Sequence, residues 1–185
     1  MEIKDRIILA CRELARPGGF YNINMDELAA HAGVSKRTVY RYFRSKEDII
    51  EATLDAFMAE ASAEVDRMLA SETDPAKFVA NMFKYLLTNG QFIINPAGLR
   101  DLRQHYPLLW QKIDNFRTKR VETVIEFLIN NSHSSLLKEI DRRIISAVIL
   151  ASIQSVLTPE FILDNGLTFE ETASQLGKLL IAAFT

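Results

Sequence analysis

Eleven consecutive residues of this sequence are rich in groups that bind anions. They contain no acidic residue, and their five basic residues are Lys36, Arg37, Arg41, Arg44 and Lys46. Guanidinium and ammonium groups form charge-assisted hydrogen bonds with phosphate oxygens, and a guanidinium also matches the N7 and O6 acceptors of guanine. Tyr40 and Tyr42 lie among them and add hydroxyl donors. The stretch therefore predicts contacts with phosphate groups and base edges.

The overall charge of the chain does not account for this concentration of basic residues. The 185 residues have a formal net charge of -2, yet residues 1–50 carry nine Lys or Arg against seven Asp or Glu. A polyanion would therefore be attracted to the N-terminal quarter. The alternative is a solvated basic helix face that only promotes solubility, which is the ordinary explanation of an isolated run of charge.

Two short helices joined by a tight turn would position the basic residues. Asn24 is a candidate N-cap for the first helix, which ends at Gly33, where a left-handed backbone is easiest for glycine. Ser35 is a candidate N-cap for the second helix, residues 36–43. This pattern is typical of a helix-turn-helix, whose second helix enters the major groove of DNA.

The second of these helices has two different faces. At 100° per residue, its basic residues and Tyr40 span an arc of about 140°. Val39 and Phe43 lie on the other side, where they can pack on the preceding helix. The basic face is thus on the helix that a helix-turn-helix inserts into DNA, which favours DNA binding over a role in solubility.

The segment FYNINMDELAAHAGVSKRTVYRYFRSKEDII, residues 20–50, resembles the DNA-binding domain of the TetR family of transcriptional regulators. The resemblance rests on the Ala-Gly-Val-Ser turn, the Tyr-x-Tyr-Phe run ending at Phe43, and the Ser-Lys-Glu that follows at Ser45. Asn24 stands where a threonine or serine usually caps the helix. Arg37 stands where a small residue is common, so we expect an unusual base preference.

The resemblance implies a set of DNA contacts. These residues are Asn24, Ser35, Lys36, Arg37, Thr38, Tyr40, Arg41, Tyr42 and Lys46. The tyrosine hydroxyls would donate to phosphates, and Lys46 would hold a phosphate at the start of the next helix, where free N–H groups also attract anions. Each has a structural alternative, because Asn24 and Ser35 would cap helices without DNA and the tyrosines can cover helix edges.

The remainder of the sequence predicts a helical protein. Hydrophobic residues make up 48% and charged residues 25%, with only five prolines and seven glycines. Apolar residues recur at helical spacing, so we expect an all-α fold of about nine helices. We divide it into a helix-turn-helix DNA-binding domain, residues 1–48, and a helical effector-binding and dimerisation domain, residues 49–185. The expected helices are 3–16, 25–32, 36–43, a long helix from Ser45 to the region of Ser71, and then 75–89, 96–104, 107–131, 137–157 and 168–183.

Several classes of site are not expected. Cys11 is the single cysteine, and its spacing makes it a core residue of the first helix rather than a reactive thiol. His31, His105 and His133 lack the spacing of metal ligands, and no catalytic motif is present, so we expect no metal, no cofactor and no enzyme activity. No segment reads as a membrane span or a signal peptide, which predicts a cytoplasmic protein.

The middle of the chain, residues 75–131, is where the resemblance implies a cavity for a small-molecule effector. The candidate lining residues are Phe57, Phe83, Leu86, Phe92, Arg103, Trp110 and Phe116. The alternative is that the aromatic residues are ordinary core, and that Arg100 and Arg103 pair with Asp101 or Asp114 rather than with a ligand.

The last two expected helices are apolar nearly all round and must bury both faces. Ala147, Ala151 and Ser155 recur every four residues and would permit close approach, and Leu176 and Leu180 would complete the surface. The resemblance implies a four-helix dimer interface here, while a central helix in a monomer is the alternative.

Together these features predict a homodimeric regulator, most simply a repressor, that leaves a pseudo-palindromic operator in double-stranded DNA when a small molecule binds. An activator fits the same sequence. Two other classes stay open: an enzyme that acts in the middle cavity, and a DNA-binding regulator whose C-terminal domain only dimerises or meets a protein partner.

Overall fold

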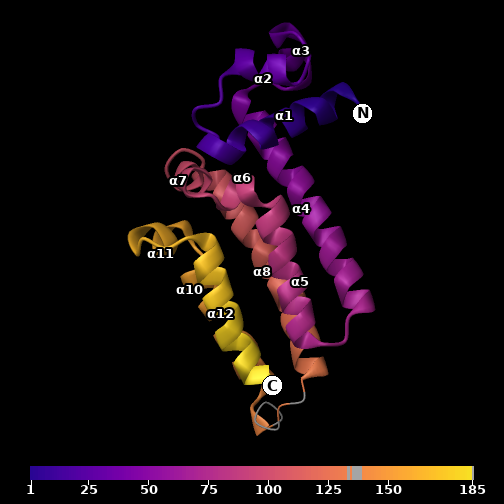
Figure 1. Cartoon of the computed structure of the whole chain (residues 1–185), viewed down its shortest axis with the longest axis vertical. Coiled ribbons are helices and arrows are strands. Elements are labelled where there is room, and N and C mark those ends of the chain that lie inside the picture. Colours follow the sequence, from indigo (N-terminus) through magenta and orange to yellow (C-terminus); the bar gives the residue numbers. More distant parts are fainter. Residues whose placement is uncertain (133, 135–138, 185) are drawn as a thin grey trace.

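Helices form all the regular structure of the residues that this computed structural model describes, which are 1–132, 134 and 139–184 (Figure 1). The expected all-α fold is confirmed. Within these residues, nine helices have seven or more residues and two are shorter. The helices are α1 (Ile3–Gly18), α2 (Met25–His31), α3 (Lys36–Tyr42), α4 (Lys46–Ser71), α5 (Pro75–Asn89), α6 (Gln91–Ile94), α7 (Pro96–Gln104), α8 (Pro107–Asn131), α10 (Arg142–Val156), α11 (Pro159–Asp164) and α12 (Phe169–Phe184).

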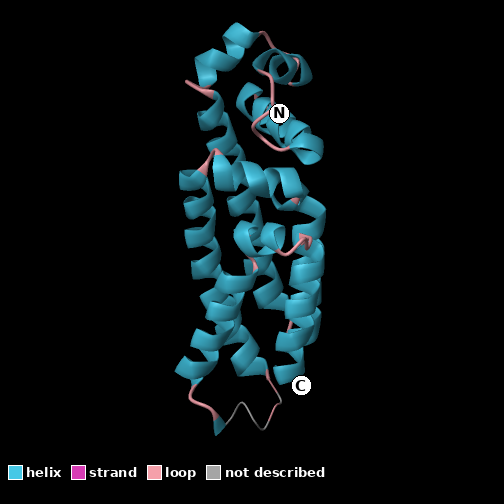
Figure 2. Ribbon diagram, turned by 90° about the vertical axis from the view of Figure 1, so that its left-hand side faces the viewer, coloured by secondary structure: helices cyan, strands magenta, loops and turns pink. Residues whose placement is uncertain are grey.

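The helices α1, α2 and α3 sit together at one end of an elongated molecule (Figure 1). The remaining long helices run lengthwise below them, as the side view in Figure 2 also shows. No described helix is long and apolar enough to cross a membrane.

The apolar stripe of α1 forms part of the core at this end. Ile7 and Cys11 are buried, which confirms the expected place of the single cysteine. Burial raises the pKa of the Cys11 thiol to about 11, so the thiol stays protonated near neutral pH. A protonated, buried thiol is a poor nucleophile.

Helix α1 ends two residues later than the sequence predicts. Pro17 lies inside its last turn because the φ angle of proline suits a helix, although proline supplies no N–H. The helix stops at Gly19, whose φ of 74° lies in the left-handed region and whose amide donates to the carbonyl of Ala15 (2.9 Å). The terminating residue is therefore this glycine and not the proline.

The long helix α4 joins the N-terminal helices to the rest of the molecule. Ser45 caps it by accepting from the amide of Asp48 (3.0 Å), and Asp48 accepts in return from the amide of Arg44 (2.9 Å). The pair resembles a capping box, with Asp48 in the position usually held by glutamate and with the return bond to the residue before the cap. Over its 26 residues α4 rises roughly 39 Å, enough to pass from one end of the fold toward the other.

Three hydrophobic clusters lie along the described part of the molecule, and the smallest of them contains Leu157, Ala173 and Leu176. The first contains Ile7, Leu28 and Val39 together with Phe92 and Leu102, so the N-terminal helices share a core with α6 and α7. The second lies among α4, α5, α8 and α10. Because the first cluster crosses the expected domain boundary after residue 48, the N-terminal helices are packed directly against the bundle.

Two helices and one further boundary also differ from expectation. Helices α6 and α11 were not expected, since segments of four and six residues are too short to show a period of 3.6. The helix expected over 137–157 begins at Arg142, because the side chain of Asp141 accepts from the amide of Arg143 (2.8 Å) and caps it. Residues 137 and 138 of that expected helix lie outside the described residues.

Candidate nucleic-acid interface and internal cavity

The turn between α2 and α3 is held by hydrogen bonds that bring the two helices together. Gly33 has a φ of 65°, and the amide of Val34 donates to the carbonyl of Ala29 (2.9 Å). The Arg6 guanidinium of α1 donates to the carbonyl of Gly33 (2.9 Å). The positive φ is what requires glycine here, and a Cβ would in addition displace the end of the flexible Arg6 side chain, whose Nη2 would lie 2.4 Å away.

Helix α3 presents its basic side to solvent. Val39 is fully buried and Phe43 nearly so, which fixes the rotation of the helix. The exposed residues of its outer side, here called the recognition face, are Lys36, Arg37, Tyr40 and Arg41. Helix α3 lies at the outer end of the molecule, with the bundle toward the other end (Figure 1). A groove of nucleic acid could therefore approach it without meeting the rest of this chain.

The residues at the start of α3 already have partners. Ser35 caps the helix, accepting from the amide of Thr38 (3.1 Å), and its hydroxyl lies 2.8 Å from the Thr38 hydroxyl. Lys36 Nζ lies 2.9 Å from Asp26 Oδ2, and this hydrogen bond raises the pKa of the ammonium group. Arg37 forms no ion pair with any residue that the structure describes, so it is the freest cation of the recognition face.

Two further expected DNA contacts lie at helix starts. Asn24 is exposed and caps α2 by accepting from the amide of Asp26 (2.8 Å). Lys46, at the start of α4, donates to the carbonyl of Tyr21, and its Nζ lies 5.8 Å from the Tyr21 ring centre. Burial lowers the pKa of Lys46. In this structure Lys46 thus ties α4 to the loop before α2.

Residues 7–53 match the profile of the family described as "Bacterial regulatory proteins, tetR family". This range contains the capped helix pair and the recognition face just described. The chain belongs to the TetR family. It is a DNA-binding transcriptional regulator. Because the members of this family are regulators and not enzymes, the enzyme alternative is set aside.

Relatives match the TetR chain over nearly its whole length. The uncharacterised HTH-type transcriptional regulator YvaF of Bacillus subtilis is 25% identical over 97% of this chain and 94% of its own. The fatty acid metabolism regulator protein of Bacillus subtilis is 22% identical over 96% and 93%. The crystal structure of the transcriptional regulator FadR from Bacillus subtilis in complex with stearoyl-CoA has a TM-score of 0.61 at 19% identity, covering 98% of this chain and 99% of that one. The fold of this TetR chain is therefore shared along its length.

The histidines do not gather in this TetR chain. His31 lies 2.6 Å from Glu13, and His105 stacks on Tyr21 with ring centres 3.8 Å apart. His133 lies outside the described residues. Among the side chains that are described, no three His, Cys, Asp or Glu are grouped as metal ligands would be.

The bundle below the recognition helix encloses an apolar cavity of about 220 Å³. Helices α4 to α8, α10 and α12 all contribute to its wall. Five of the candidate effector residues line it, namely Phe57, Phe83, Leu86, Trp110 and Phe116. Along α8 the lining extends from Trp110 to Leu128, a rise of roughly 27 Å at 1.5 Å per residue, so the cavity is long and narrow.

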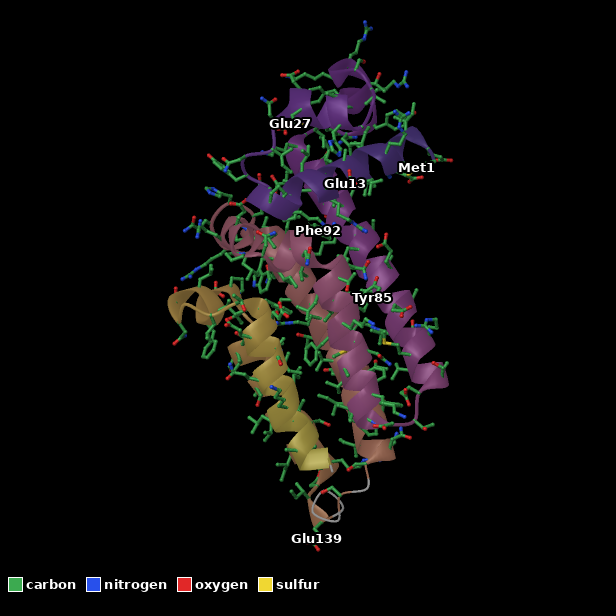
Figure 3. The ribbon with its side chains drawn as sticks, viewed as in Figure 1. Met1, Glu13, Glu27, Tyr85, Phe92 and Glu139 are labelled. Carbon is green, nitrogen blue, oxygen red and sulfur yellow. The ribbon has the colours of Figure 1, made fainter. Side chains whose placement is uncertain are left out.

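Two candidate effector residues do not line this cavity. Phe92 is fully buried between Phe20 and Phe57, with ring centres 6.1 and 5.4 Å away, where the N-terminal helices meet the bundle (Figure 3). Arg103 lies at the surface and pairs with Asp164 (3.0 Å) and Glu160 (3.5 Å). The partners suggested for Arg103 were also wrong, because helical spacing does not show which distant carboxylate a surface arginine meets.

The expected dimer surface is partly exposed. Ala147, Ala151 and Ser155 of α10 are exposed and lie in one stripe with Ile144 and Val148, both 58% exposed.

The two residues of α12 that were expected at the dimer surface are not exposed there. Leu176 is buried and, like Leu180, lines the cavity, so both leucines face inward, and Leu179 is 70% exposed instead. Residues 179–184 of α12 are all apolar, so periodicity does not separate inner from outer positions there, which explains the misplacement. The apolar surface of α10 and α12 consists of Ile144, Ala147, Val148, Ala151 and Leu179.

The junction between the N-terminal helices and the bundle depends on a residue that was not expected to have a function. Asp101 of α7 is 8% exposed, and its Oδ2 accepts from the amide of Tyr21 (2.7 Å) in the loop between α1 and α2. A Cβ at Gly19 would lie 2.3 Å from the same Oδ2. No local pattern could identify this contact, because 80 residues separate its two partners.

Proposed function

We propose that this protein is a homodimeric repressor that is released from its operator when a molecule with a long apolar chain enters the cavity. The observation that carries the proposal is that one chain combines an outward basic recognition face with an apolar cavity bordered by α4. Helix α4 follows directly after α3, which carries the recognition face, and it also forms part of the cavity wall. A ligand that moves α4 would change the position of the recognition face.

The recognition face and its neighbours form the proposed DNA contact, in an N-terminal domain of residues 1–48. Arg37 and Arg41 would read base edges, and Lys36 would exchange Asp26 for DNA. The hydroxyls of Tyr40 and Tyr42 would donate to phosphates, with both rings exposed, at 47% and 42%. Ser35, Thr38 and Asn24 would offer helix-start groups to the backbone, and Lys46 would reach a phosphate by leaving the Tyr21 carbonyl.

The apolar surface of α10 and α12 would form the homodimer interface in a C-terminal domain of residues 49–185. A helix with apolar side chains on its outer face is stabilised by covering that face. Two copies joined there would place two recognition helices in successive major grooves. The half-sites are therefore expected about 10 bp apart, or a multiple of that.

The cavity sets the class of effector. Apart from two arginines, its lining side chains are apolar or glycine, so an apolar body gains the most from entering it. The Bacillus subtilis FadR structure named above contains stearoyl-CoA, and an acyl chain is the effector that we propose here. A coupling of about 1–3 kcal/mol between effector and DNA would change operator affinity about 5- to 150-fold. A regulator acting in this way would work in the cytoplasm, beside the DNA.

Selection of genomic DNA fragments on the purified full-length chain, followed at two salt concentrations, tests the DNA part of the proposal. Recovery of a pseudo-palindrome bound by dimers is the expected result, and adding a medium-chain acyl thioester should then release the fragment. Weak binding that ignores sequence would remove the recognition face from sequence readout. Operator binding that no acyl compound alters would leave a regulator whose bundle only dimerises or meets a protein.

A further inference from the structure

A groove of about 630 Å³ lies on the surface of the bundle, next to the apolar cavity. This outer groove runs between α5 and α12, which pack against each other (Figure 1). Its lining combines charged residues, among them Lys84, Glu171 and Lys178, with small apolar residues such as Ala80 and Ala173. The outer groove is therefore a more polar space than the cavity beside it.

The outer groove and the cavity share part of their walls. Val79, Phe83 and Gly177 line both spaces, and the other described residues of the groove do not line the cavity. A single layer of residues thus separates the two spaces here. Val79 is buried and branched at Cβ, which makes its side chain stiff, and Gly177 has no side chain. Phe83 is half-buried, so its ring is the part of this wall that can turn.

Gly177 shows how closely the Phe83 ring covers this place. A glycine inside a helix is unfavourable by about 1 kcal/mol relative to alanine, yet Gly177 lies in the middle of α12. A Cβ at Gly177 would lie 2.6 Å from Phe83 Cε2, and its three nearest atoms would all belong to the Phe83 ring. The ring therefore rests directly on the backbone of α12, and no side chain of Gly177 stands in its way when it turns.

The outer groove stays accessible in the proposed operator-bound dimer. Leu179, of the apolar surface of α10 and α12, follows Gly177 by two residues and so lies about 200° around the helix from it. The recognition face belongs to α3, at the far end of the molecule from the bundle (Figure 1). Neither a second chain on the apolar surface nor DNA on the recognition face would cover the groove.

We propose that the outer groove is the entrance of the cavity and that the Phe83 ring is its gate. An apolar effector enters between α5 and α12 when the ring turns away from Gly177 into the groove. This inference rests on the proposed function, since it states how the effector of the repressor reaches its site. A gate controls the rates of entry and exit alike and leaves the equilibrium affinity nearly unchanged.

Stopped-flow mixing of the full-length protein with N-phenyl-1-naphthylamine, a neutral dye that fluoresces in apolar surroundings, tests the route. Trp110 is the only tryptophan and lines the cavity, so energy transfer from Trp110 reports dye inside it. Phe83→Ala removes the gate. We expect the association and dissociation rate constants to rise together by about tenfold, which corresponds to a barrier lowered by about 1.4 kcal/mol, while the dissociation constant changes little.

Phe116→Ala is the matched control for the loss of an aromatic ring. Phe116 lines the cavity from α8 but does not line the outer groove. Its removal changes the cavity wall and hence the affinity for the dye, but the association rate constant should keep its wild-type value. Circular dichroism melting curves verify that both variants are folded.

A block placed in the outer groove is the converse test and leaves Phe83 intact. Ser174 is exposed and lines the groove without lining the cavity. Ser174→Cys labelled with N-cyclohexylmaleimide should slow entry and exit of the dye by similar factors. Cys11, the single cysteine of the chain, is 1% exposed and so is shielded from the reagent. Ala63→Cys with the same label, at an exposed position of α4, is the control and should keep the wild-type rates.

The outcomes separate this inference from the proposed function. Unchanged rates in labelled Ser174→Cys, or an association rate constant of Phe83→Ala equal to that of Phe116→Ala, would place the entrance elsewhere. Release of the operator by an acyl thioester would in that case still retain the effector-released repressor. If the dye accepts no energy from Trp110 in the wild-type protein, the cavity does not admit an apolar molecule, and both the proposed effector site and this inference are wrong.

Discussion

At the residue scale, the cations near the recognition face differ in whether another group of the protein already binds them. Arg37 is exposed without an ion pair to any described residue, whereas Lys36 is held by Asp26 and Lys46 by the carbonyl of Tyr21. Arg41 lies 5.3 Å from the ring of Tyr42. A side chain that must leave a partner before it meets DNA contributes less net affinity, so Arg37 should contribute most to discrimination between bases.

The first prediction compares Arg37 with Lys46. Arg37→Ala should cost about 1–3 kcal/mol of operator binding and relax the base preference at one position of each half-site. Lys46→Ala should weaken all sequences alike and reduce the salt dependence, because a phosphate contact carries no sequence information. Titrations of an operator and its single-base variants at two salt concentrations measure both effects.

Arg67→Ala is the control for this comparison. Arg67 is an exposed arginine near the far end of α4 that pairs with Glu64, and its loss should leave operator binding unchanged. Equal losses on every sequence for Arg37→Ala and Lys46→Ala would assign Arg37 to the phosphates.

At the element scale, the turn between α2 and α3 decides whether the recognition face can reach a groove. Three glycines of the described residues have positive φ angles: Gly19, Gly33 and Gly166. Gly33 alone belongs to the helix-turn-helix, and its carbonyl accepts from Arg6 of α1. Its left-handed backbone therefore determines how α3 is set relative to both preceding helices.

The second prediction separates strain from function at these glycines. Gly33→Ala should lower the free energy of unfolding by about 1–2 kcal/mol, the usual cost of a left-handed non-glycine residue, and should also weaken operator binding. Gly166→Ala has the same φ of 65° with no atom near its Cβ, so it should cost similar stability and leave operator binding intact. Urea unfolding and operator titration give the two quantities.

Gly18→Ala completes this series. Gly18 is helical with nothing within 4 Å of its Cβ, so alanine should leave stability unchanged or raise it by up to about 1 kcal/mol. Operator binding lost equally in the Gly33 and Gly166 variants would mean that destabilisation, and not the turn, controls DNA affinity.

At the scale of the whole molecule, two surfaces link the recognition face to the rest of the protein. One is the junction, where Asp101 accepts from the Tyr21 amide and the ring of His105 stacks on Tyr21. The other is the apolar surface of α10 and α12, which would set the distance between two recognition faces. In the proposed mechanism the junction would transmit changes within one chain, and the apolar surface would transmit them between chains.

The third prediction concerns the junction. Asp101→Ala leaves the Tyr21 amide without its acceptor and should lower the free energy of unfolding by about 1–3 kcal/mol. Amide hydrogen exchange in the loop between α1 and α2 should become faster. Asp101→Asn keeps an acceptor oxygen and should recover most of both losses. Identical behaviour of the two variants would show that the negative charge, and not the hydrogen bond, holds the junction.

The fourth prediction concerns the dimer. Leu179→Glu should give a monomer in sedimentation and a steep loss of operator affinity, because a buried unpaired carboxylate opposes association and two half-sites need two chains. Leu108→Glu is the matched control: Leu108 is 73% exposed and lies on α8, which contributes no residue to the apolar surface, so the association state should not change. A dimer that persists in Leu179→Glu would place the interface elsewhere.

The sequence by itself determined the local features of this protein. Capping residues such as Asn24, Ser35 and Ser45 form their hydrogen bonds within the next three residues, so the helix starts and the helix-turn-helix could be predicted. The buried and exposed sides of α3 followed from its period of 3.6, because basic and apolar residues alternate clearly there.

Only the tertiary structure decided which distant residues meet. It separated the inward Leu176 and Leu180 from the outward Leu179, moved Phe92 from the cavity to the junction, and brought Asp101 to Tyr21 across 80 residues of sequence. Local periodicity shows that a side chain is apolar or charged, but its partner is chosen by packing between helices, which no single helix encodes.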